Sequence, residues 1–285
     1  MGLIKMLRFF IRLATASFTF GALFSSGATA ETYTRSHDFI LGTNLDLVIV
    51  AESETTANLV ESAVLTEIDR LNAILSTYDS ESEISVLNTA DSATVSFDLF
   101  AALSACEAFR EQTKNALSCR IGGLLETWQL GEDASELPSR ALLRLAAGEI
   151  RRANLNLDEG AMSLDRPDVV KFQLNALAKG YIIDRAMEAA RATSPDLDGL
   201  LINVGGDIKT WGRSPDDAAW TAAIKAARFE SGDGVEITLS DGALATSGRG
   251  PRDREIAGKS YSHIISPKNG WHVTGISQAS VFAED

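Results

Sequence analysis

Residues that commonly bind zinc are scarce in this sequence, which has two cysteines and three histidines among 285 residues. Neither Cys106 nor Cys119 has a histidine or cysteine partner at the spacing of a zinc site, so the pattern excludes a site of that kind. The two thiols can pair in an oxidising compartment. A buried free thiol is an equally good interpretation, because Cys106 falls on the apolar side of an expected helix.

No apolar run after the first thirty residues is long enough to cross a membrane. Residues 1–30 themselves have the features of a secretory signal peptide: a basic start, an apolar run and the sequence A-T-A at 28–30. Threonine and serine interrupt that run, which is too short for a membrane span. We therefore expect residues 1–30 to be removed and residues 31–285 to be an exported, soluble protein in the periplasm or another extracytoplasmic space.

Basic residues are outnumbered, because 26 lysines and arginines oppose 39 aspartates and glutamates and give a formal net charge of −13. This balance argues against a nucleic-acid or anionic-membrane partner. An acidic protein that binds phosphate groups needs a local cation or a metal ion to do so. Proline is also scarce, with six residues, and no repeat or Pro-rich linker divides residues 31–285. We expect one domain of two closely packed lobes.

The periodicity of apolar residues predicts an α+β architecture, with mixed or antiparallel sheets flanked by helices, rather than a doubly wound sheet. A short turn is expected at residues 85–88, and the inward faces of the first two helices are expected to include Leu59 and Phe109. The expected helices span residues 54–75, 97–115, 140–154 and 179–192; the expected strands span 45–51, 200–204, 221–226, 235–239 and 276–283; turn signals lie at 233–234, 241–242 and 269–270.

The stretch from Gln173 to Asp207 carries the strongest indication of a binding site. Lys179 stands in a small-residue turn that opens an expected helix, and the apolar strand that follows runs into Gly205 and Gly206. A glycine pair after a buried strand lets a ligand approach the backbone closely, and the free N–H groups at a helix start attract anions. The alternative is an ordinary connection between a helix and a strand.

Eight short motifs, taken in order along the chain, resemble those of the ApbE family of FAD:protein FMN transferases over nearly all of residues 31–285. They read L-G-T at 41–43, L-S-T-Y at 75–78, S-E-I-S-V-L-N at 82–88, S-C-R-I-G at 118–122, Q-L-N-A-L-A-K-G-Y at 173–181, N-V-G-G-D at 203–207, A-T-S-G at 245–248 and H-I-I-S-P-K-N-G at 263–270.

The resemblance implies an ApbE-like fold, compact and two-lobed, and a phosphoryl transfer that depends on Mg²⁺ and uses FAD as substrate. A threonine or serine hydroxyl of an acceptor protein, such as a subunit of a redox complex, would attack the phosphorus, AMP would leave and FMN would stay on the acceptor. The family holds its metal partly through a backbone carbonyl, which by register belongs to Ala176. An FAD pyrophosphatase that gives FMN and AMP, a non-catalytic exported FAD-binding protein and a secreted domain without a ligand are the alternatives.

Several residues can be given roles on this basis. Tyr78 offers an aromatic face for a flavin or adenine ring, although a core or surface tyrosine is the alternative. Lys179 and His263 are the catalytic candidates, because one can neutralise a pyrophosphate and the other can shuttle a proton; a solvated lysine and a structural histidine are the alternatives. The candidate cofactor-binding residues are Leu41, Tyr78, Leu117, Ser118, Cys119, Gln173, Gly205, Gly206, Thr246, Ser247 and His263.

Some positions depart from the family pattern. Leu41 stands where the family has methionine, and Gln173 stands where relatives have the aspartate on the adenine side of FAD. Ser118 and Cys119 stand where an aspartate is common. The family's metal-binding A-D-A-x-x-T segment would follow the last strand, and Asp285 lies a few residues too early to match it. We therefore expect the C-terminal part of the domain to be missing from this sequence.

Overall fold

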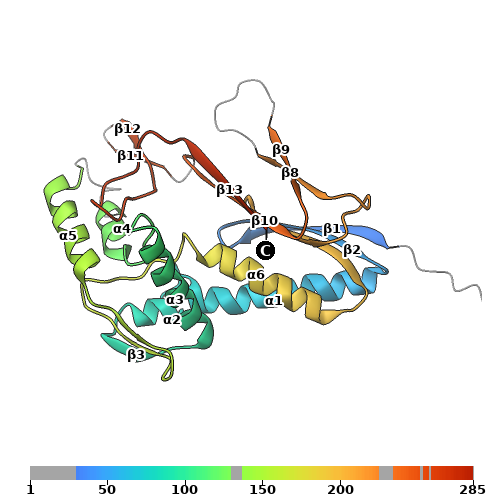
Figure 1. Cartoon of the computed structure of the whole chain (residues 1–285), viewed down its shortest axis with the longest axis horizontal. Coiled ribbons are helices and arrows are strands. Elements are labelled where there is room, and N and C mark those ends of the chain that lie inside the picture. Colours follow the sequence, from blue (N-terminus) through green and yellow to red (C-terminus); the bar gives the residue numbers. More distant parts are fainter. Residues whose placement is uncertain (1–29, 130–136, 225–233, 251–252, 257, 285) are drawn as a thin grey trace, which may run out of the picture.

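The structure is a computed structural model that describes residues 30–129, 137–224, 234–250, 253–256 and 258–284. Its largest element is a six-stranded sheet in which every strand is antiparallel to its neighbours (Figure 1). The strands follow the order β1 (Glu31–Ile40), β2 (Thr43–Ala51), β6 (Leu197–Val204), β7 (Asp207–Gly212), β10 (Gly242–Gly248) and β13 (Gln278–Glu284).

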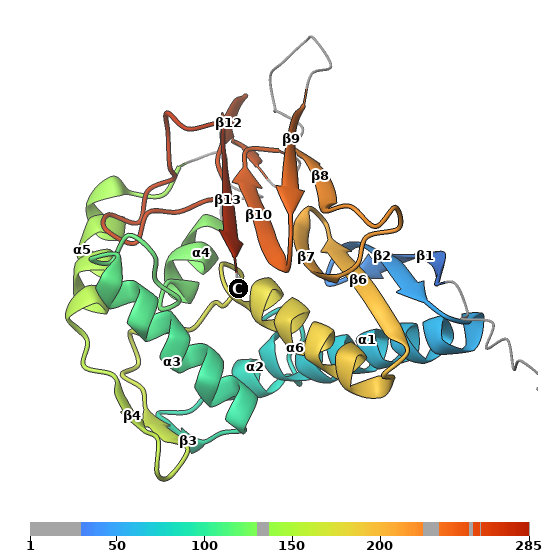
Figure 2. The ribbon, with the colours of Figure 1, turned by 45° about the vertical axis from the view of Figure 1, so that its right-hand side comes forward.

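Two helices cover one face of this sheet. Helices α1 (Glu54–Leu75) and α6 (Ala178–Thr193) lie side by side along it (Figure 1 and Figure 2). Leu45, Leu47 and Ile49 of β2 are fully buried in the same hydrophobic core as the apolar stripes of both helices. Every second residue of β2 therefore points to the helices, as the pleat of a strand requires.

A β-hairpin covers part of the other face. It consists of β8 (Trp220–Ile224) and β9 (Val235–Leu239), which pair with each other and lie outside the main sheet. Val50 of β2 packs there in a second core with Trp220, Leu239 and Leu244. Strand β2 is thus buried on both faces, which explains its nearly continuous apolar sequence.

The remaining elements form a second lobe, and part of it has a core of its own around Trp128. The helices of this lobe between residues 83 and 112 pack into the main core instead. A small sheet has the order β3–β5–β4. The elements of this lobe are α2 (Glu83–Leu87), β3 (Ser92–Thr94), α3 (Phe97–Gln112), α4 (Gly122–Gln129), α5 (Arg140–Arg152), β4 (Asn156–Asp158), β5 (Ser163–Asp165), β11 (Arg254–Ile256) and β12 (Lys259–Tyr261).

Serine side chains begin four of the helices. The Oγ atoms of Ser53, Ser82, Ser96 and Ser139 accept an N–H from the residue three positions later, at the starts of α1, α2, α3 and α5. Such caps satisfy N–H groups that have no partner inside the helix. Helix α6 is different, because Leu177 stands at its cap position and forms no side-chain cap.

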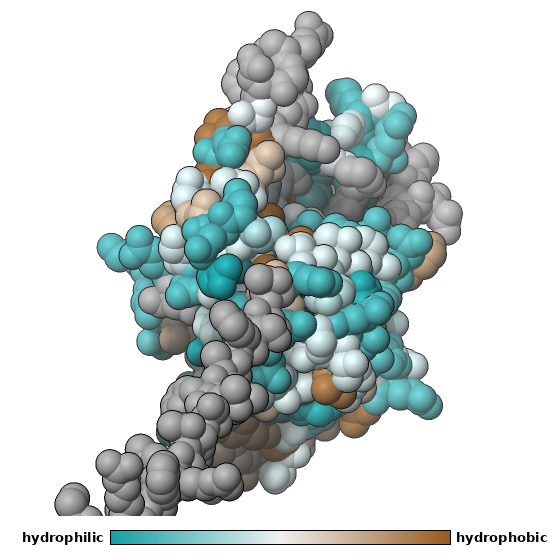
Figure 3. All heavy atoms as spheres, turned by 90° about the vertical axis from the view of Figure 1, so that its right-hand side faces the viewer, coloured by the Kyte–Doolittle hydropathy of each residue, from teal (hydrophilic) through white to brown (hydrophobic). Residues whose placement is uncertain are grey.

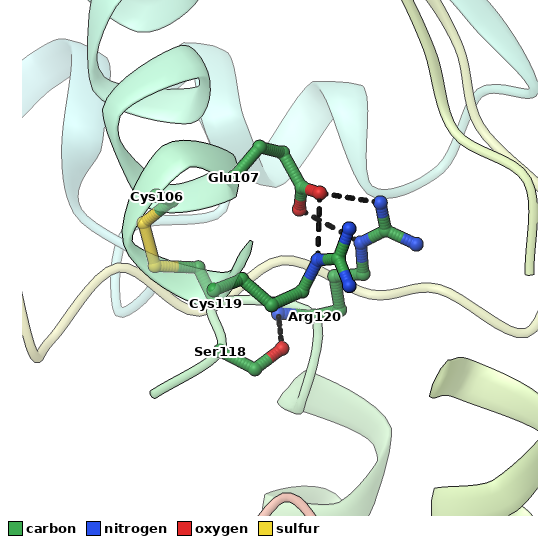
Figure 4. Close-up of a disulfide and its surroundings, with 6 residues drawn as sticks. Cys106, Glu107, Ser118, Cys119 and Arg120 are labelled. Carbon is green, nitrogen blue, oxygen red and sulfur yellow. Dashed lines mark hydrogen bonds and ion pairs between the residues drawn. A yellow bond between two sulfur atoms is a disulfide. The ribbon is translucent and has the colours of Figure 1, made fainter. Parts of the chain in front are cut away.

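The loop after α3 is fastened to that helix at two consecutive positions (Figure 4). Cys106 of α3 forms a disulfide with Cys119, so the structure has the bridged form rather than a free thiol. Glu107 accepts a hydrogen bond of 2.7 Å from Nε of Arg120 and another of 2.8 Å from Nε of Arg110. Burial alone would raise the pKa of Glu107, but the hydrogen bonds from Arg120 and Arg110 outweigh it and hold this pKa below its usual range.

The predicted helices and strands are largely confirmed, with several corrections. Leu59 is 52% exposed and Phe109 is 45% exposed, so neither belongs to the core. Residues 85–88 are not a turn, since most of them lie in α2. Gly242 does not close a hairpin, because β9 pairs with β8 while β10 pairs with β7 and β13. Strand β1 was not expected at all.

Some expectations fall outside the described residues. These are the signal peptide except for its last residue, the turn residue Asp233, the last two residues of the strand expected at 221–226, and Asp285. Within the described part of the chain, no helix has the length and apolar character that a membrane span requires. The surface that lies on the right in Figure 1 is largely hydrophilic where it is described, with scattered hydrophobic spots (Figure 3).

The burial of α1 predicts different costs for two leucine substitutions in that helix. Leu71 is 0% exposed and Leu59 is 52% exposed. We expect Leu71→Ala to lower the free energy of unfolding by about 2–5 kcal/mol, because it leaves a cavity. Leu59→Ala removes little buried surface and should change it by less than about 0.5 kcal/mol. Urea denaturation measures both values, and equal losses would contradict the described face of α1.

The charge state of Glu107 predicts a dependence of stability on pH. A carboxylate with a lowered pKa in the folded state stabilises the fold above its unfolded pKa of about 4.3, and this contribution is lost as the pH falls through the folded value. At pH 7 we expect Glu107→Gln to lower the free energy of unfolding by about 3 kcal/mol. The difference in the free energy of unfolding between this variant and the wild type should shrink as the pH falls below 5, because the wild-type carboxylate also becomes protonated.

Glu111→Gln is the matched control for this measurement. Glu111 lies on the same helix, and its side chain is 75% exposed with a single ion pair of 3.6 Å to Arg110. Such exposed pairs contribute little to stability. The free energy of unfolding of this variant, measured by urea denaturation, should therefore equal that of the wild type at every pH. A gap between the wild type and Glu107→Gln that stays constant from pH 7 to pH 3 would contradict the assignment.

Candidate functional site

Two tight hairpin turns lie next to each other at one end of the main sheet. Leu41 and Gly42 join β1 to β2, and Gly205 and Gly206 join β6 to β7. All four residues have positive φ, at 49°, 72°, 61° and 96° in chain order, as two-residue hairpin turns of type I′ require. The turns are neighbours because β2 pairs with β6, and the N–H of Gly205 donates to the carbonyl of Asn44.

The two glycines of the second turn have different surroundings. A Cβ on Gly205 would lie 2.4 Å from Oγ1 of Thr43, so this position is closed by the neighbouring turn. A Cβ on Gly206 would meet no atom within 4 Å. The N–H of Gly206 donates to Oδ1 of Asn203, which holds the turn in place. Gly205 is therefore needed for packing, and Gly206 is the one with open space beside it.

Lys179 lies beside this turn. Its Nζ is 3.7 Å from Oδ2 of Asp207, the first residue of β7, and both side chains are about three-quarters buried. Lys179 stands in the first turn of α6, which begins at Leu177 without a side-chain cap, and the N–H of Ala178 there donates to the carbonyl of Leu174. A lysine and helix N–H groups together form a positive environment in an acidic chain, and such an environment attracts phosphate.

Strand β10 brings Thr246 and Ser247 to the same end of the sheet. Leu244 of β10 is paired with Ile208 of β7. Because the two strands are antiparallel, the residues of β10 after Leu244 continue past Asp207, the first residue of β7. Oγ1 of Thr246 lies 2.9 Å from Oγ of Ser280 on β13, and Ser247 is exposed. Their hydroxyl groups are suitable donors to phosphate oxygens.

His263 is held by a carboxylate that sequence reasoning missed. Its Nδ1 lies 3.1 Å from Oδ1 of Asp253, and the same oxygen accepts the backbone N–H of His263. The other oxygen of Asp253 accepts a hydrogen bond of 2.8 Å from Nε of Arg249, which directly follows β10. Burial would raise the pKa of Asp253, but the hydrogen bonds from Arg249 and His263 lower it below its usual range. His263 is thus connected to the end of β10.

Helices α4 and α5 of the second lobe hold the loop that contains His263. The indole N–H of Trp128 donates to the carbonyl of Gly270 over 2.9 Å. Gly270 has a φ of 69°, and a Cβ there would lie 3.0 Å from the Leu143 backbone oxygen. Only glycine fits this turn without strain, so the loop between His263 and Gly270 rests on α4 and α5.

Tyr78 and Gln173 are predicted cofactor-binding residues, and hydrogen bonds hold both of them. Tyr78 is 77% exposed, and its hydroxyl accepts a hydrogen bond of 2.8 Å from Nδ2 of Asn175. The side-chain oxygen of Gln173 accepts a hydrogen bond of 2.7 Å from the hydroxyl of Thr77. The backbone N–H of Gln173 donates to the carbonyl of Cys119 over 2.7 Å. An exposed, oriented ring is what a stacking role requires.

The segment from Gln173 to Lys179 connects the part of the site around Tyr78 with the part around Lys179. Ala176 lies in the middle of it and is exposed. Among the described residues, no backbone N–H donates to the Ala176 carbonyl. A carbonyl of an exposed residue without such a partner can act as an oxygen ligand. No group of three or more His, Cys, Asp or Glu side chains in the described ranges could hold a metal ion.

The remaining predicted residues lie in the loop after α3, away from solvent. Ser118 is 6% exposed and Cys119 is 1% exposed. Leu117 packs against the main core. The sulfur of Cys119 is engaged in the disulfide, and its carbonyl is engaged by Gln173. This loop therefore holds the backbone of Gln173, and direct contacts of Leu117, Ser118 and Cys119 with a cofactor stay a prediction.

Sequence reasoning missed the partners of the predicted residues rather than the residues themselves. Asp207 stood within a motif and was not assigned a role, although it is the carboxylate beside Lys179. Asp253 and Arg249 lie in a G-R-G-P-R-D stretch, whose mixed charges after a small-residue motif were the available signal. Thr77 and Asn175 flank predicted residues, and their role depends on contacts across about a hundred residues.

Comparisons with known proteins agree with this arrangement. The family model described as "ApbE family" matches residues 41–285. FAD:protein FMN transferase from Klebsiella pneumoniae (strain 342) is 28% identical over 238 residues, which cover 81% of this chain and 71% of that protein. FAD:protein FMN transferase from Vibrio cholerae serotype O1 is 29% identical over 215 residues, which cover 72% of this chain and 64% of that protein.

Solved structures show the same fold. The ApbE protein of Thermotoga maritima has a TM-score of 0.79 and 27% identity, and the match covers 90% of this chain and 82% of that one. The apo form of the Pseudomonas stutzeri flavinyl transferase ApbE has a TM-score of 0.75 and 20% identity, with coverage of 89% and 80%. The predicted α+β, ApbE-like architecture is confirmed. Since the family model spans most of its length, the chain belongs to the ApbE family.

Proposed function

We propose that this protein transfers FMN from FAD to a threonine or serine hydroxyl of an acceptor protein. The hydroxyl oxygen forms a bond to the phosphorus on the FMN side, the bond to the bridging pyrophosphate oxygen breaks, and AMP leaves. The observation that carries this proposal is the convergence of separate family motifs at one end of the main sheet. The relatives named FAD:protein FMN transferase support it.

The Lys179 side of the site suits the pyrophosphate. The ammonium group of Lys179, the N–H groups at the start of α6 and the open backbone at Gly206 are all at this end of the sheet. Thr246 and Ser247 add hydroxyl donors from β10. A substrate with two linked phosphates needs such donors, because the chain as a whole is negatively charged.

His263 is the candidate for the proton transfer. An aspartate that accepts the Nδ1–H of a histidine fixes its tautomer and leaves Nε2 as the proton acceptor. Asp253 is placed for this role by its two contacts with His263 and by its hydrogen bond from Arg249. In the proposed reaction, Nε2 of His263 takes the proton of the attacking hydroxyl.

The flavin or adenine ring is assigned to the Tyr78 side. The ring of Tyr78 is exposed, and Asn175 fixes its hydroxyl. Gln173 presents its amide group beside Thr77 at the other end of the same segment. The distance along the chain from Gln173 to Lys179 is short, so one extended dinucleotide can contact both ends of this segment.

A Mg²⁺ ion is part of the proposal. Magnesium keeps several waters and is often bound through few protein oxygens together with substrate phosphates. Ala176 is exposed, and its carbonyl fits such a role, since no backbone N–H among the described residues donates to it. When bound, the ion would act as a Lewis acid on the phosphate to be transferred.

The proposed setting is extracytoplasmic. The basic and apolar pattern of residues 1–30 supports export, and the disulfide between Cys106 and Cys119 suits an oxidising compartment. The acceptor would then be another exported protein or an exposed part of a redox complex.

The proposed reaction predicts a covalent product. Incubation of the protein with FAD, Mg²⁺ and a candidate acceptor should yield a fluorescent acceptor band on a denaturing gel, with AMP released in equal amount. Removal of Mg²⁺ with EDTA should abolish both products. Release of FMN and AMP without any adduct, across all acceptors tried, would favour the pyrophosphatase instead. FAD binding that ignores EDTA and yields no product would favour a non-catalytic binder.

The role of His263 predicts a selective loss of rate. His263→Ala should lower the rate of adduct formation by about 10²–10⁴-fold, the usual contribution of general acid–base catalysis. His37→Ala is a matched control, since both side chains are 30% exposed and both contact a carboxylate. The control should keep the wild-type rate. Equal rates for the two variants would remove His263 from the mechanism.

A further inference from the structure

The disulfide is connected to the proposed flavin site by an unbroken series of short contacts. The carbonyl of Cys119 accepts the backbone N–H of Gln173 over 2.7 Å. The side-chain oxygen of Gln173 accepts the hydroxyl of Thr77 over 2.7 Å. Tyr78 is the next residue, and its hydroxyl is held by Asn175. The position of Cys119 therefore affects both segments that carry the predicted ring contacts.

The loop from residue 113 to residue 121 lies between α3 and α4 and contains no helix or strand of its own. Just after Cys119, it pairs with the segment that precedes Gln173. Ile121 forms an isolated parallel bridge with Lys171, and the N–H of Gly122 donates to the Lys171 carbonyl over 2.9 Å. The disulfide holds Cys119 itself, and the ion pair with Glu107 holds the next residue, Arg120 (Figure 4). Arg120 is also fixed by a hydrogen bond of 2.8 Å to the carbonyl of Ala153.

The disulfide and the contacts of Arg120 hold different parts of this loop. The ion pair and the Ala153 contact would survive cleavage of the disulfide, so the loop would stay attached to α3 and to the end of α5. The carbonyl that faces Gln173 belongs to the cysteine, and its direction depends on the backbone angles that the bridge restrains. Cleavage would thus remove one restraint on this carbonyl, while the pairing of Ile121 and Gly122 with Lys171 would remain. Both cysteines lie in the main core, so the separate core around Trp128 would keep its contacts.

We propose that the Cys106–Cys119 disulfide is a positioning element of the flavin site, so that affinity for FAD depends on its redox state. Cleavage by a dithiol reductant would transfer two electrons and two protons to the bridge, giving two thiols and the oxidised, disulfide form of the reductant. In the thiol form, Gln173 and Tyr78 are less well preorganised, and binding must order them at a cost in affinity. The inference rests on the proposed function, because it assumes that FAD binds at this site.

The test compares the oxidised and reduced forms of the full chain. Both cysteines are 1% exposed, so the protein is reduced in urea with a dithiol and refolded without an oxidant. FAD binding is then followed by the quenching of flavin fluorescence. We expect the Kd of the reduced form to be raised about tenfold, which corresponds to the ordering of a small number of side chains. Cys106→Ala/Cys119→Ala should show the raised Kd and no response to reductant.

Glu107→Gln separates positioning from stability. This variant loses the ion pair with Arg120 and keeps the disulfide. It should be less stable than the wild type and yet show the same tenfold rise in Kd on reduction. A Kd that rises in the oxidised form of Glu107→Gln as much as it does on reduction of the wild type would overturn the proposal, because any loosening of the loop would then suffice.

Hydrogen exchange gives a readout that needs no FAD. In the reduced protein, the amide of Gln173 should exchange faster, since its acceptor is the carbonyl of Cys119. Amides in α5 should keep their protection. Unchanged exchange at Gln173 together with an equal Kd in both redox forms would overturn the positioning role and leave the proposed function intact. Absence of FAD binding by the oxidised wild type would overturn both, and loss of the helical circular dichroism on reduction would show that the bond holds the fold instead.

Discussion

The pairing of β2 with β6 is the constraint on which the rest of this structure depends. These strands are separated by about 150 residues in the sequence and are aligned from Leu45 opposite Val204 to Ala51 opposite Leu197. Their register brings the turn at Gly42 beside the turn at Gly205. It also places α1, which follows β2, beside α6, which precedes β6. A shift of one residue would turn the buried face of β2 away from those helices.

The site that results brings two basic side chains, each paired with a carboxylate, to one end of the main sheet. Lys179 and Arg249 come from different parts of the chain, and each lies beside an aspartate, Asp207 and Asp253 respectively. Such pairs hold long basic side chains in one direction, which lowers the entropy lost when a phosphate binds. The second of these aspartates also orients His263. In the proposed function, the same type of contact serves binding on one side and proton transfer on the other.

Local patterns predicted much of the fold. The limits predicted for helix α1 agree with the observed ones because its apolar residues repeat at helical spacing. Strand β9 was placed equally well. Strand β1 was missed, since its alternation of polar and partly buried residues carries little apolar signal and its partner β2 supplies the pairing. The partner of β9 depends on long-range packing, which a turn signal cannot specify.

The candidate site could be predicted as a set of motifs but not as a network. Lys179, His263 and Tyr78 stood in recognisable sequences. What could not be seen was which residue faces each of them, because Asp207 and Asp253 are brought into contact by the sheet and the loops rather than by spacing. The buried position of Cys119 was equally hidden, since it follows from the bridge to α3.

The contact between Thr43 and Gly205 links two positions that are far apart in the sequence. A Cβ at residue 205 would overlap the Thr43 side chain. The residue at position 43 in the first hairpin therefore limits which residue can stand at position 205 in the second. Any relative in which residue 205 gains a side chain would need a smaller residue at position 43, and a larger residue at 43 would keep glycine fixed at 205. We therefore expect substitutions at these two positions to be coupled.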